Sequence, residues 1–433
     1  MPKLIVSIHR LSGPQRSCTF WLAFVGATLL SFGIFLKNGN ILNDTDSFHY
    51  MSMANHRMDM AMLPFACRQL GVLLVQAFVT LLHLTIAHSF VLEGAIGFGI
   101  LLSTVLYSLI HSDAPVWIIP AIAGLFFWTL QLENLVMPDL FYAALLSCLL
   151  LLLRRGNLML AALMMFPLML ARESTLLTLL CFLIAGWRLL RVRESVVAIL
   201  ATVAGASLVK RLTAGALANR ERISPTFYMV AKMPWNFLKN VLGLNPWANV
   251  YPACAVPRWQ MPLHIGTLHA VGFCTADFHY PITALACASA SFGLFPLLLF
   301  KLRRVCIESV NHPGRDAIFL RFCLLYGVVS FLLTPLLGES FLRLYFYSWP
   351  LFLVAMPILM GAARASFSST TAALLFLALH LALSWSWMFL DPLPVIWIAL
   401  VVYPAGWLLL YNFWQIASET IPAAVDASQS LMC

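Results

Sequence analysis

Apolar runs long enough to cross a lipid bilayer recur along this chain, and they restrict its fold more than any other feature. A membrane-crossing helix needs about 20 mostly apolar residues to pass through the hydrocarbon layer. The chain has 433 residues, of which 61% are hydrophobic and only 10% are charged. Because the runs are continuous rather than alternating with polar residues, they predict an all-α polytopic membrane protein and not a β-barrel.

Thirteen apolar runs are candidates for membrane spans. They cover residues 18–36, 70–87, 91–111, 115–131, 136–153, 157–171, 175–188, 194–210, 283–300, 317–337, 346–362, 369–387 and 393–411. The N-terminus and the short connections between runs hold basic clusters, which the positive-inside rule assigns to the cytoplasm. These clusters contain Lys3, Arg10, Arg16, Arg154, Arg155, Arg188, Arg191, Arg193, Lys301, Arg303, Arg304 and Arg364. They all fall on one side only if one early run does not span.

The run at 70–87 is the weakest candidate for a span because it contains Gln76 and His83, is flanked by Gln69 and His88, and follows a polar stretch. We interpret it as an interfacial or re-entrant helix at the outer face. About twelve spans then remain, with both termini in the cytoplasm. The alternative is that another run before Arg154 does not span, which would change only the early topology.

This topology divides the chain into three parts. Residues 1–210 form an N-terminal transmembrane module, which includes a first outer loop at 37–69 and the juxtamembrane helix at 70–87. Residues 211–282 form a long extracytoplasmic loop, rich in aromatic residues, proline and asparagine. Residues 283–433 form a C-terminal transmembrane module.

The net charge of +9 does not indicate a nucleic-acid partner in a chain of this class. Basic residues of membrane proteins set the orientation and contact anionic headgroups, so membrane lipids are the expected partners. Only Cys254 and Cys274 share a polar loop, and the sequence leaves open whether they form a disulfide. No cysteine spacing typical of a metal site is present.

Nearly all carboxylates that interrupt apolar sequence fall at the outer face in this topology. The outer charged groups are Asp44 and Asp46 in the first loop, Glu133 and Asp139 in QLENLVMPDL, Arg172 and Glu173 in ARESTLL, and Glu339 and Arg343 in GESFLRLYF. The cytoplasmic connections show mainly basic residues. This asymmetry predicts that any chemistry takes place at the outer face.

Each of these groups also has a purely structural explanation. The aspartates could cap helices. Glu339 could pair with Arg343, four residues later on one helix. Arg172 and Glu173 are harder to explain in this way, because they occupy a short connection near membrane depth, where charges are costly and usually paired or functional.

Several short motifs resemble the pattern of GT-C-type polyprenyl-phosphate-sugar glycosyltransferases and their bacterial relatives. An aspartate and a tyrosine follow the first span as Asp46-x-x-x-Tyr50, and PFACRQLGVLL places Arg68 before the juxtamembrane helix. The remaining motifs are Pro138-Asp139-Leu140, Arg172-Glu173-Ser174 and Glu339-x-x-x-Arg343. The likeness covers most of the chain in layout, although Val72 stands where the relatives often have proline.

The resemblance implies a GT-C-like fold and a reaction at the extracytoplasmic face of the bacterial inner (plasma) membrane. A sugar would pass from a polyprenyl-phosphate donor to a hydroxyl of a glycan, lipid or protein acceptor. Because a hydroxyl is a poor nucleophile, a carboxylate must accept its proton. We assign this role to Asp46, with Asp44 as the rival.

The remaining candidate residues would bind the substrates. The leaving phosphate needs cations but no general acid, so neither a metal nor another cofactor is required. The candidate substrate-binding residues are Arg68, Arg172 and Arg343 for the phosphate, and Tyr50, Asp139, Glu173 and Glu339 for the acceptor or for fixing those arginines.

Two other functions remain open at this stage. A transporter or flippase of lipid-linked sugars would place charges midway along helices that face a central path. A polymerase or ligase of surface polysaccharide would use residues of the long outer loop, such as Arg258, His264, His269 or His279.

Overall fold

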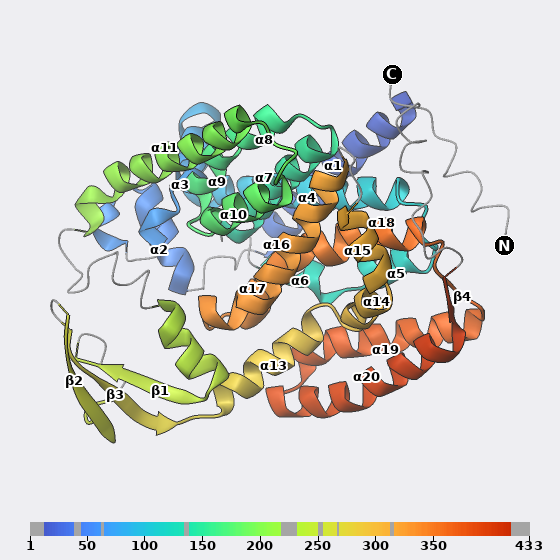
Figure 1. Ribbon diagram of the computed structural model, residues 1–433. Coiled ribbons are helices and arrows are strands. Elements are labelled where there is room, and N and C mark those ends of the chain that lie inside the picture. The colour runs from blue at the N-terminus through green and yellow to red at the C-terminus, as the bar shows by residue number, and fades with distance from the viewer. Residues whose placement is uncertain are drawn as a thin grey trace.

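The computed structural model describes most of the chain. It covers residues 13–38, 45–61, 65–133, 138–217, 232–249, 254–265, 268–311 and 316–416. Within these ranges the chain is mainly helical, and the helices form one body with a small sheet at one end (Figure 1).

Helices account for the ordered elements between residues 13 and 217 in the described ranges. They are α1 (Gly13–Asn38), α2 (Thr45–Ala54), η2 (Met58–Met60), η3 (Phe65–Cys67), α3 (Gln69–Leu82), α4 (Ile86–Ile110), α5 (Ile118–Ala123), α6 (Phe126–Glu133), α7 (Pro138–Arg154), α8 (Leu158–Leu163), α9 (Met165–Ala171), α10 (Thr175–Ala185) and α11 (Val192–Leu217).

The second half of the chain begins with a sheet and then returns to helices. Its elements are η4 (Phe237–Val241), β1 (Leu244–Ala248), β2 (Trp259–Ile265), β3 (Leu268–Ala276), α13 (His279–Ser291), α14 (Phe295–Lys301), α15 (Arg303–Asn311), α16 (Asp316–Leu337), α17 (Phe341–Tyr345), η5 (Phe346–Ser348), η6 (Pro350–Ala355), α18 (Met356–Ala362), β4 (Ser366–Phe367), α19 (Thr370–Phe389), α20 (Pro392–Phe413) and β5 (Trp414–Gln415).

Six of the described helical segments are long and apolar enough to cross a membrane, or seven if α13 and α14, bent by 70° at their junction, count as one. They are α4, α11, α16, the segment from α17 to α18, α19 and α20. The chain is therefore an α-helical membrane protein, but the prediction of about twelve spans is wrong in its number.

The reason is that several predicted runs form broken or short helices. Residues 118–132 divide into α5 and α6 near Gly124, and residues 158–171 divide into α8 and α9. Helix α10 has 11 residues and rises only about 16 Å, roughly half of a hydrocarbon layer. The run at 70–87 becomes the 14-residue helix α3, which ends at His83 with φ of 54° and is also too short to span.

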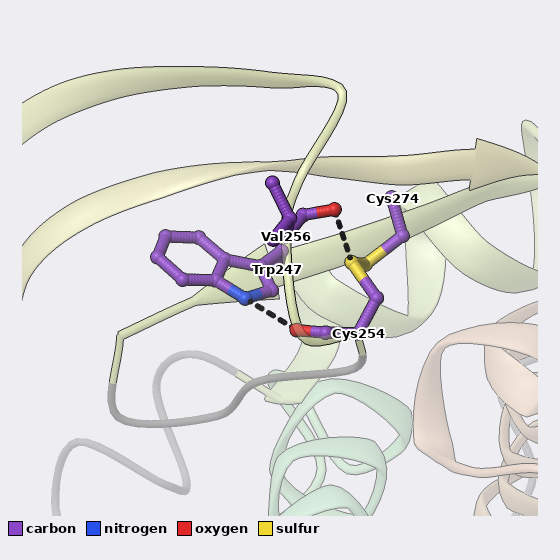
Figure 2. The surroundings of a disulfide bond; sticks show 4 residues. All are labelled: Trp247, Cys254, Val256 and Cys274. Atoms are coloured by element: carbon purple, nitrogen blue, oxygen red, sulfur yellow. Dashed lines mark hydrogen bonds between the residues drawn. A yellow bond between two sulfur atoms is a disulfide. The ribbon is translucent and has the colours of Figure 1, made fainter.

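The description as all-α is also incomplete, because the long loop contains a three-stranded antiparallel sheet in the order β1-β3-β2. The sheet lies at the lower left of Figure 1, beyond the helical body. Cys254 and Cys274 form a disulfide that ties the loop before β2 to β3. Figure 2 shows the Trp247 indole beside it, donating a hydrogen bond of 3.0 Å to the Cys254 carbonyl.

Two groups of contacts define opposite ends of the helical body. At one end, the Arg154 guanidinium lies 5.2 Å from the ring of Tyr107 and 5.9 Å from that of Phe319, so the ends of α4 and α7 meet the start of α16. We call this the Arg154 end. At the other, which we call the Asp139 end, Asp139 at the start of α7 meets Arg343, which follows the end of α16.

Aromatic packing in the core fixes the position of the segment that contains Arg343. The ring of Phe346 packs on Phe127 with centroids 4.8 Å apart, and Phe292 stacks on Phe352 at 4.4 Å. All four rings are buried, and the contacts join α6, the end of α13, η5 and η6. Close packing of this kind fixes the backbone that follows Arg343.

Candidate functional site

Most of the residues singled out in the sequence converge at the Asp139 end. The residues brought together are Tyr50, Arg68, Asp139, Arg172, Glu173 and Arg343. Asp44 lies outside the described residues. Asp46 lies in the first turn of α2, four residues before Tyr50, and the structure describes its backbone only.

One half of the cluster is built around Arg68, which directly precedes α3. Its Nε and Nη2 donate to the two carboxylate oxygens of Glu173 at 3.2 and 3.0 Å, and its Nη1 donates to the Tyr50 hydroxyl at 3.0 Å. The Arg68 side chain is 4% exposed and that of Glu173 is 16% exposed. A bidentate pair of this kind fixes both planes, so the guanidinium has a defined direction.

The pKa values in this half follow from burial opposed by charge. Burial alone would raise the pKa of Glu173, but the adjacent Arg68 and Arg172 outweigh it and hold that pKa well below its usual value. Burial raises the pKa of the Tyr50 hydroxyl, which Arg68 only partly offsets. Glu173 is therefore ionised and Tyr50 neutral around pH 7.

The other half is built around Asp139 in the first turn of α7. The Arg172 guanidinium forms an ion pair with Asp139, and the Tyr347 hydroxyl donates to the same carboxylate oxygen while accepting from Arg172. The Nε of Arg343 lies 3.6 Å from the second carboxylate oxygen. The guanidinium of Arg172 also lies over the Tyr347 ring, 4.6 Å from its centroid.

Local sequence explains why both carboxylates lie at helix starts. Pro138 begins α7 because it needs no partner for a backbone N–H, so Asp139 occupies the first turn. Arg172 is extended, with φ of −164° and ψ of 144°, and it ends α9 directly before α10. Negative side chains at helix N-termini are favoured by the unpaired amides there.

A lysine from the long loop adds to the charge of this cluster. Lys232 lies in a helical turn at 232–236 and is half-buried. The pKa of Lys232 is lowered to about 8, chiefly by burial, and the three arginines of the cluster act in the same direction while Glu173 opposes them. The loop therefore contributes a fourth cation close enough to sense the other three.

Cations are frequent among the described charged groups of the cluster. They are the three arginines and Lys232, and they lie around the carboxylates of Asp139 and Glu173. These charges occupy a region where they are buried and weakly screened. An arrangement of this kind suits the phosphate group of a ligand.

Glu339 does not join this cluster through its described contacts. Its carboxylate accepts from the Lys239 ammonium at 2.6 Å, and its side chain is 52% exposed. Lys239 also lies 4.0 Å from the centroid of the Tyr280 ring. The expected helical pair of Glu339 with Arg343 is replaced by a partner a hundred residues earlier in the chain.

Tyr347 and Lys232 were not predicted from the sequence to belong to this cluster. Tyr347 lies four residues after Arg343, a spacing that places both on one helical face, so this signal was present in LRLYFY. Lys232 has no comparable signal, because its position depends on how the long loop folds back. Among the described residues, no group of three or more metal-ligating side chains occurs.

The loop residues that a ligase would use lie on or beside the sheet, except His279, which begins α13. Arg258 directly precedes β2, and the rings of His264 and His269 lie 5.9 Å apart on β2 and β3. Both histidines are exposed. The buried cluster at the Asp139 end is drawn from other segments.

Comparison with protein-family models finds no match for this chain, and comparisons with curated proteins and with solved structures find none either.

Proposed function

We propose that this chain is a membrane-embedded glycosyltransferase that moves a sugar from a polyprenyl-phosphate donor to an acceptor hydroxyl at the extracytoplasmic face. The observation that supports it most is the cluster of three arginines and Lys232 around Asp139 and Glu173. The cluster forms where apolar helices end, which is where the phosphate of a lipid-linked sugar would lie.

The arginines and the lysine of the cluster fit the electrostatic course of this reaction. A sugar-phosphate diester carries one negative charge, and the departing phosphate monoester carries up to two near neutral pH. A site with several cations stabilises the leaving group more than the donor, and this difference accelerates transfer. Arg68 and Arg172 are held by their carboxylates, so they need little reorganisation as the charge develops.

The proton acceptor in this proposal is Asp46. It begins the helix that carries Tyr50, which is hydrogen-bonded to Arg68, so the backbone of Asp46 lies one helical turn from the cluster. Asp139 and Glu173 suit this role less, because each is engaged by arginines and Glu173 has a lowered pKa. A carboxylate stabilised in this way is a weak base.

The disulfide supports an extracytoplasmic position for the cluster. Disulfides persist mainly in oxidising compartments outside the cytoplasm. The Cys254–Cys274 sheet adjoins the helical turn with Lys232, and Asn236 and Asn240 of this segment donate to carbonyls at the end of α16. The Arg154 end, with its basic connections, would then face the cytoplasm as the positive-inside rule requires.

Replacing Asp46 tests the proposal directly. In cells where the Asp46→Asn variant replaces the unchanged chain, we expect the rate of sugar transfer to fall by about 10²–10⁴-fold, the usual contribution of a general base. The readouts are mass spectrometry of surface glycans and release of polyprenyl phosphate from synthetic polyprenyl-phosphate hexoses by purified protein.

Asp59→Asn is the matched control, because Asp59 is an exposed carboxylate of the same outer segment, 4.0 Å from Arg57. Its transfer should equal that of the unchanged chain, at the same abundance in the membrane. Transfer that survives Asp46→Asn but is lost on changing His264 or His269 would instead support a ligase. Undiminished transfer with every variant would overturn Asp46 as the base, and no transfer by the unchanged purified chain would overturn the proposed enzyme.

A further inference from the structure

A second concentration of positive charge lies at the junction of α14 and α15. Helix α15 leads toward the start of α16, whose Phe319 lies beneath Arg154, so this junction belongs to the Arg154 end. A cavity of about 150 Å³ opens there, lined by Lys301, Arg303, Arg304, Val305 and Ile416. Three of these five described lining residues are cations, and none is a carboxylate.

The chain turns these cations toward the cavity by burying the residue between them. Leu302 is completely buried in the main core, so its neighbours Lys301 and Arg303 are directed outward. Arg303 and Arg304 are exposed, and Lys301 is half-buried. The buried Leu302 side chain thus fixes the backbone, while the charged groups of its neighbours stay accessible.

Neutral groups hold two of these cations. The Lys301 ammonium lies 4.6 Å from the Trp407 ring centroid and 5.4 Å from that of Tyr411. The Arg303 guanidinium lies over the Phe300 ring at 4.6 Å and donates to the Phe300 carbonyl at 3.1 Å. Rings and carbonyls orient a cation without cancelling its charge, so Lys301 and Arg303 keep their positive charge beside the cavity.

The surface beside the cavity is apolar. Phe300 on α14 is 52% exposed, and on α20 Leu408 is 59% and Tyr411 is 70% exposed. Phe300 and Trp407 join the two helices, with ring centroids 5.6 Å apart. A ligand that filled both the cavity and this face would need an anionic head and an apolar tail.

We propose that this cavity binds the phosphate headgroup of an anionic membrane phospholipid, whose acyl chains lie along the exposed faces of α14 and α20. This cavity is independent of the proposed glycosyltransferase site, since it lies at the opposite end of the molecule. Basic pockets beside membrane-spanning helices on the cytoplasmic side are suited to such headgroups. The aromatic residues next to Lys301 suit the level of the headgroups.

Lipid retention by the purified full chain tests this proposal. The protein is equilibrated with equal amounts of phosphatidylglycerol and phosphatidylcholine, and bound lipid is measured by native mass spectrometry. The unchanged chain should retain phosphatidylglycerol preferentially. The double variant K301Q/R303Q should lose at least about ten-fold of this preference, because each basic residue near a headgroup contributes substantially.

The double variant R191Q/R193Q removes the same charge from two exposed arginines at the start of α11 and should retain the preference. Equal loss in both variants, or no preference in the unchanged chain, would overturn the proposal. Displacement of phosphatidylglycerol by inorganic phosphate would assign the cavity to soluble anions instead. If K301Q/R303Q does not fold, a photoreactive acyl chain on phosphatidylglycerol decides with the unchanged chain: crosslinks should map to α14 and α20, and crosslinks elsewhere would refute the site.

Discussion

The two ends of the helical body hold positive charge in opposite ways. At the Asp139 end, Arg68 and Arg172 are buried and are engaged by carboxylates and tyrosine hydroxyls. At the Arg154 end, Lys301 and Arg303 contact aromatic rings and stay accessible. Burying a charge is costly unless it is paired, so the arginines at the Asp139 end need carboxylate and hydroxyl partners in defined positions. The cations at the Arg154 end stay in contact with water or headgroups, so they need no such partners.

This difference separates two meanings of an arginine in a membrane protein. An exposed arginine in a short connection orients the chain and meets headgroups, and its exact partner matters little. Arg172 and Arg343 are different, because both contact the carboxylate of Asp139. A buried arginine that shares a carboxylate in this way binds a ligand or stabilises the fold. Substitutions at the two ends should therefore differ in size.

The largest effect is expected at the Arg68–Glu173 pair. Arg68→Met leaves the Glu173 carboxylate buried without its bidentate partner, and we expect the free energy of unfolding to fall by about 3–5 kcal/mol. Denaturation of the purified protein in mixed detergent, followed by circular dichroism, measures this change. At the other end, Arg191→Gln alters an exposed side chain and should change stability by less than about 0.5 kcal/mol.

The double variant R68M/E173M sharpens the same comparison. Because it removes both charges, it should recover much of the stability that Arg68→Met loses, as apolar replacements of buried pairs often do. The cycle of single and double variants then gives the coupling between the two residues. If the losses of stability in the two single variants simply add up in the double variant, the ion pair is not the reason why Arg68→Met is destabilising.

A smaller effect is expected from the titration of Lys232. Its pKa is lowered to about 8, so the positive charge of the cluster decreases as the pH rises through this value. Farnesyl phosphate keeps its double charge above pH 7, so its affinity should weaken by roughly ten-fold, about 1.4 kcal/mol, between pH 7 and 9. Equilibrium binding to the purified chain measures this, and Lys232→Gln should bind weakly with a flat pH profile.

The same lysine affects stability with the opposite sign. Between pH 8 and the ordinary lysine pKa of 10.5, the unfolded chain holds more protons on Lys232 than the folded chain does. Stability in the absence of ligand should therefore rise with pH across this window. A pH-dependent affinity that Lys232→Gln leaves unchanged would assign the titration to another group.

The sequence predicted the class of the protein and the segments of the cluster, but not how they pair. Apolar runs indicate membrane helices wherever they occur, yet breaks such as the one near Gly124 are set by packing and are hard to see in composition. The motifs identified Arg68 and Glu173 separately. Their contact joins residues 105 positions apart, which no local period encodes.

The sheet shows the same limit in another form. Residues 244–276 carry prolines and short aromatic stretches instead of clean alternation, and Pro246 and Pro262 even lie within strands. Proline normally argues against a strand, except at edges, and β1 and β2 are both edge strands here. Strands β1 and β2 depend on pairing with β3 and on the disulfide, and these contacts join residues that are far apart in the sequence.

The smallest effect is expected at the Lys239–Glu339 pair, which resembles the Arg68–Glu173 pair in distance but not in burial. Because Glu339 is half exposed, water already solvates its carboxylate, and Lys239→Ala should lower the free energy of unfolding by less than about 1 kcal/mol.

The neighbouring Asn240 is buried and donates to the carbonyls of Pro335 and Gly338 at 2.8 and 2.9 Å. Asn240→Ala leaves both carbonyls short of a donor and should cost about 1–3 kcal/mol. Hydrogen exchange across 232–249 and 335–343 reports both variants locally, and a larger loss of protection for Lys239→Ala than for Asn240→Ala would show that exposure does not decide the worth of a charge in this protein.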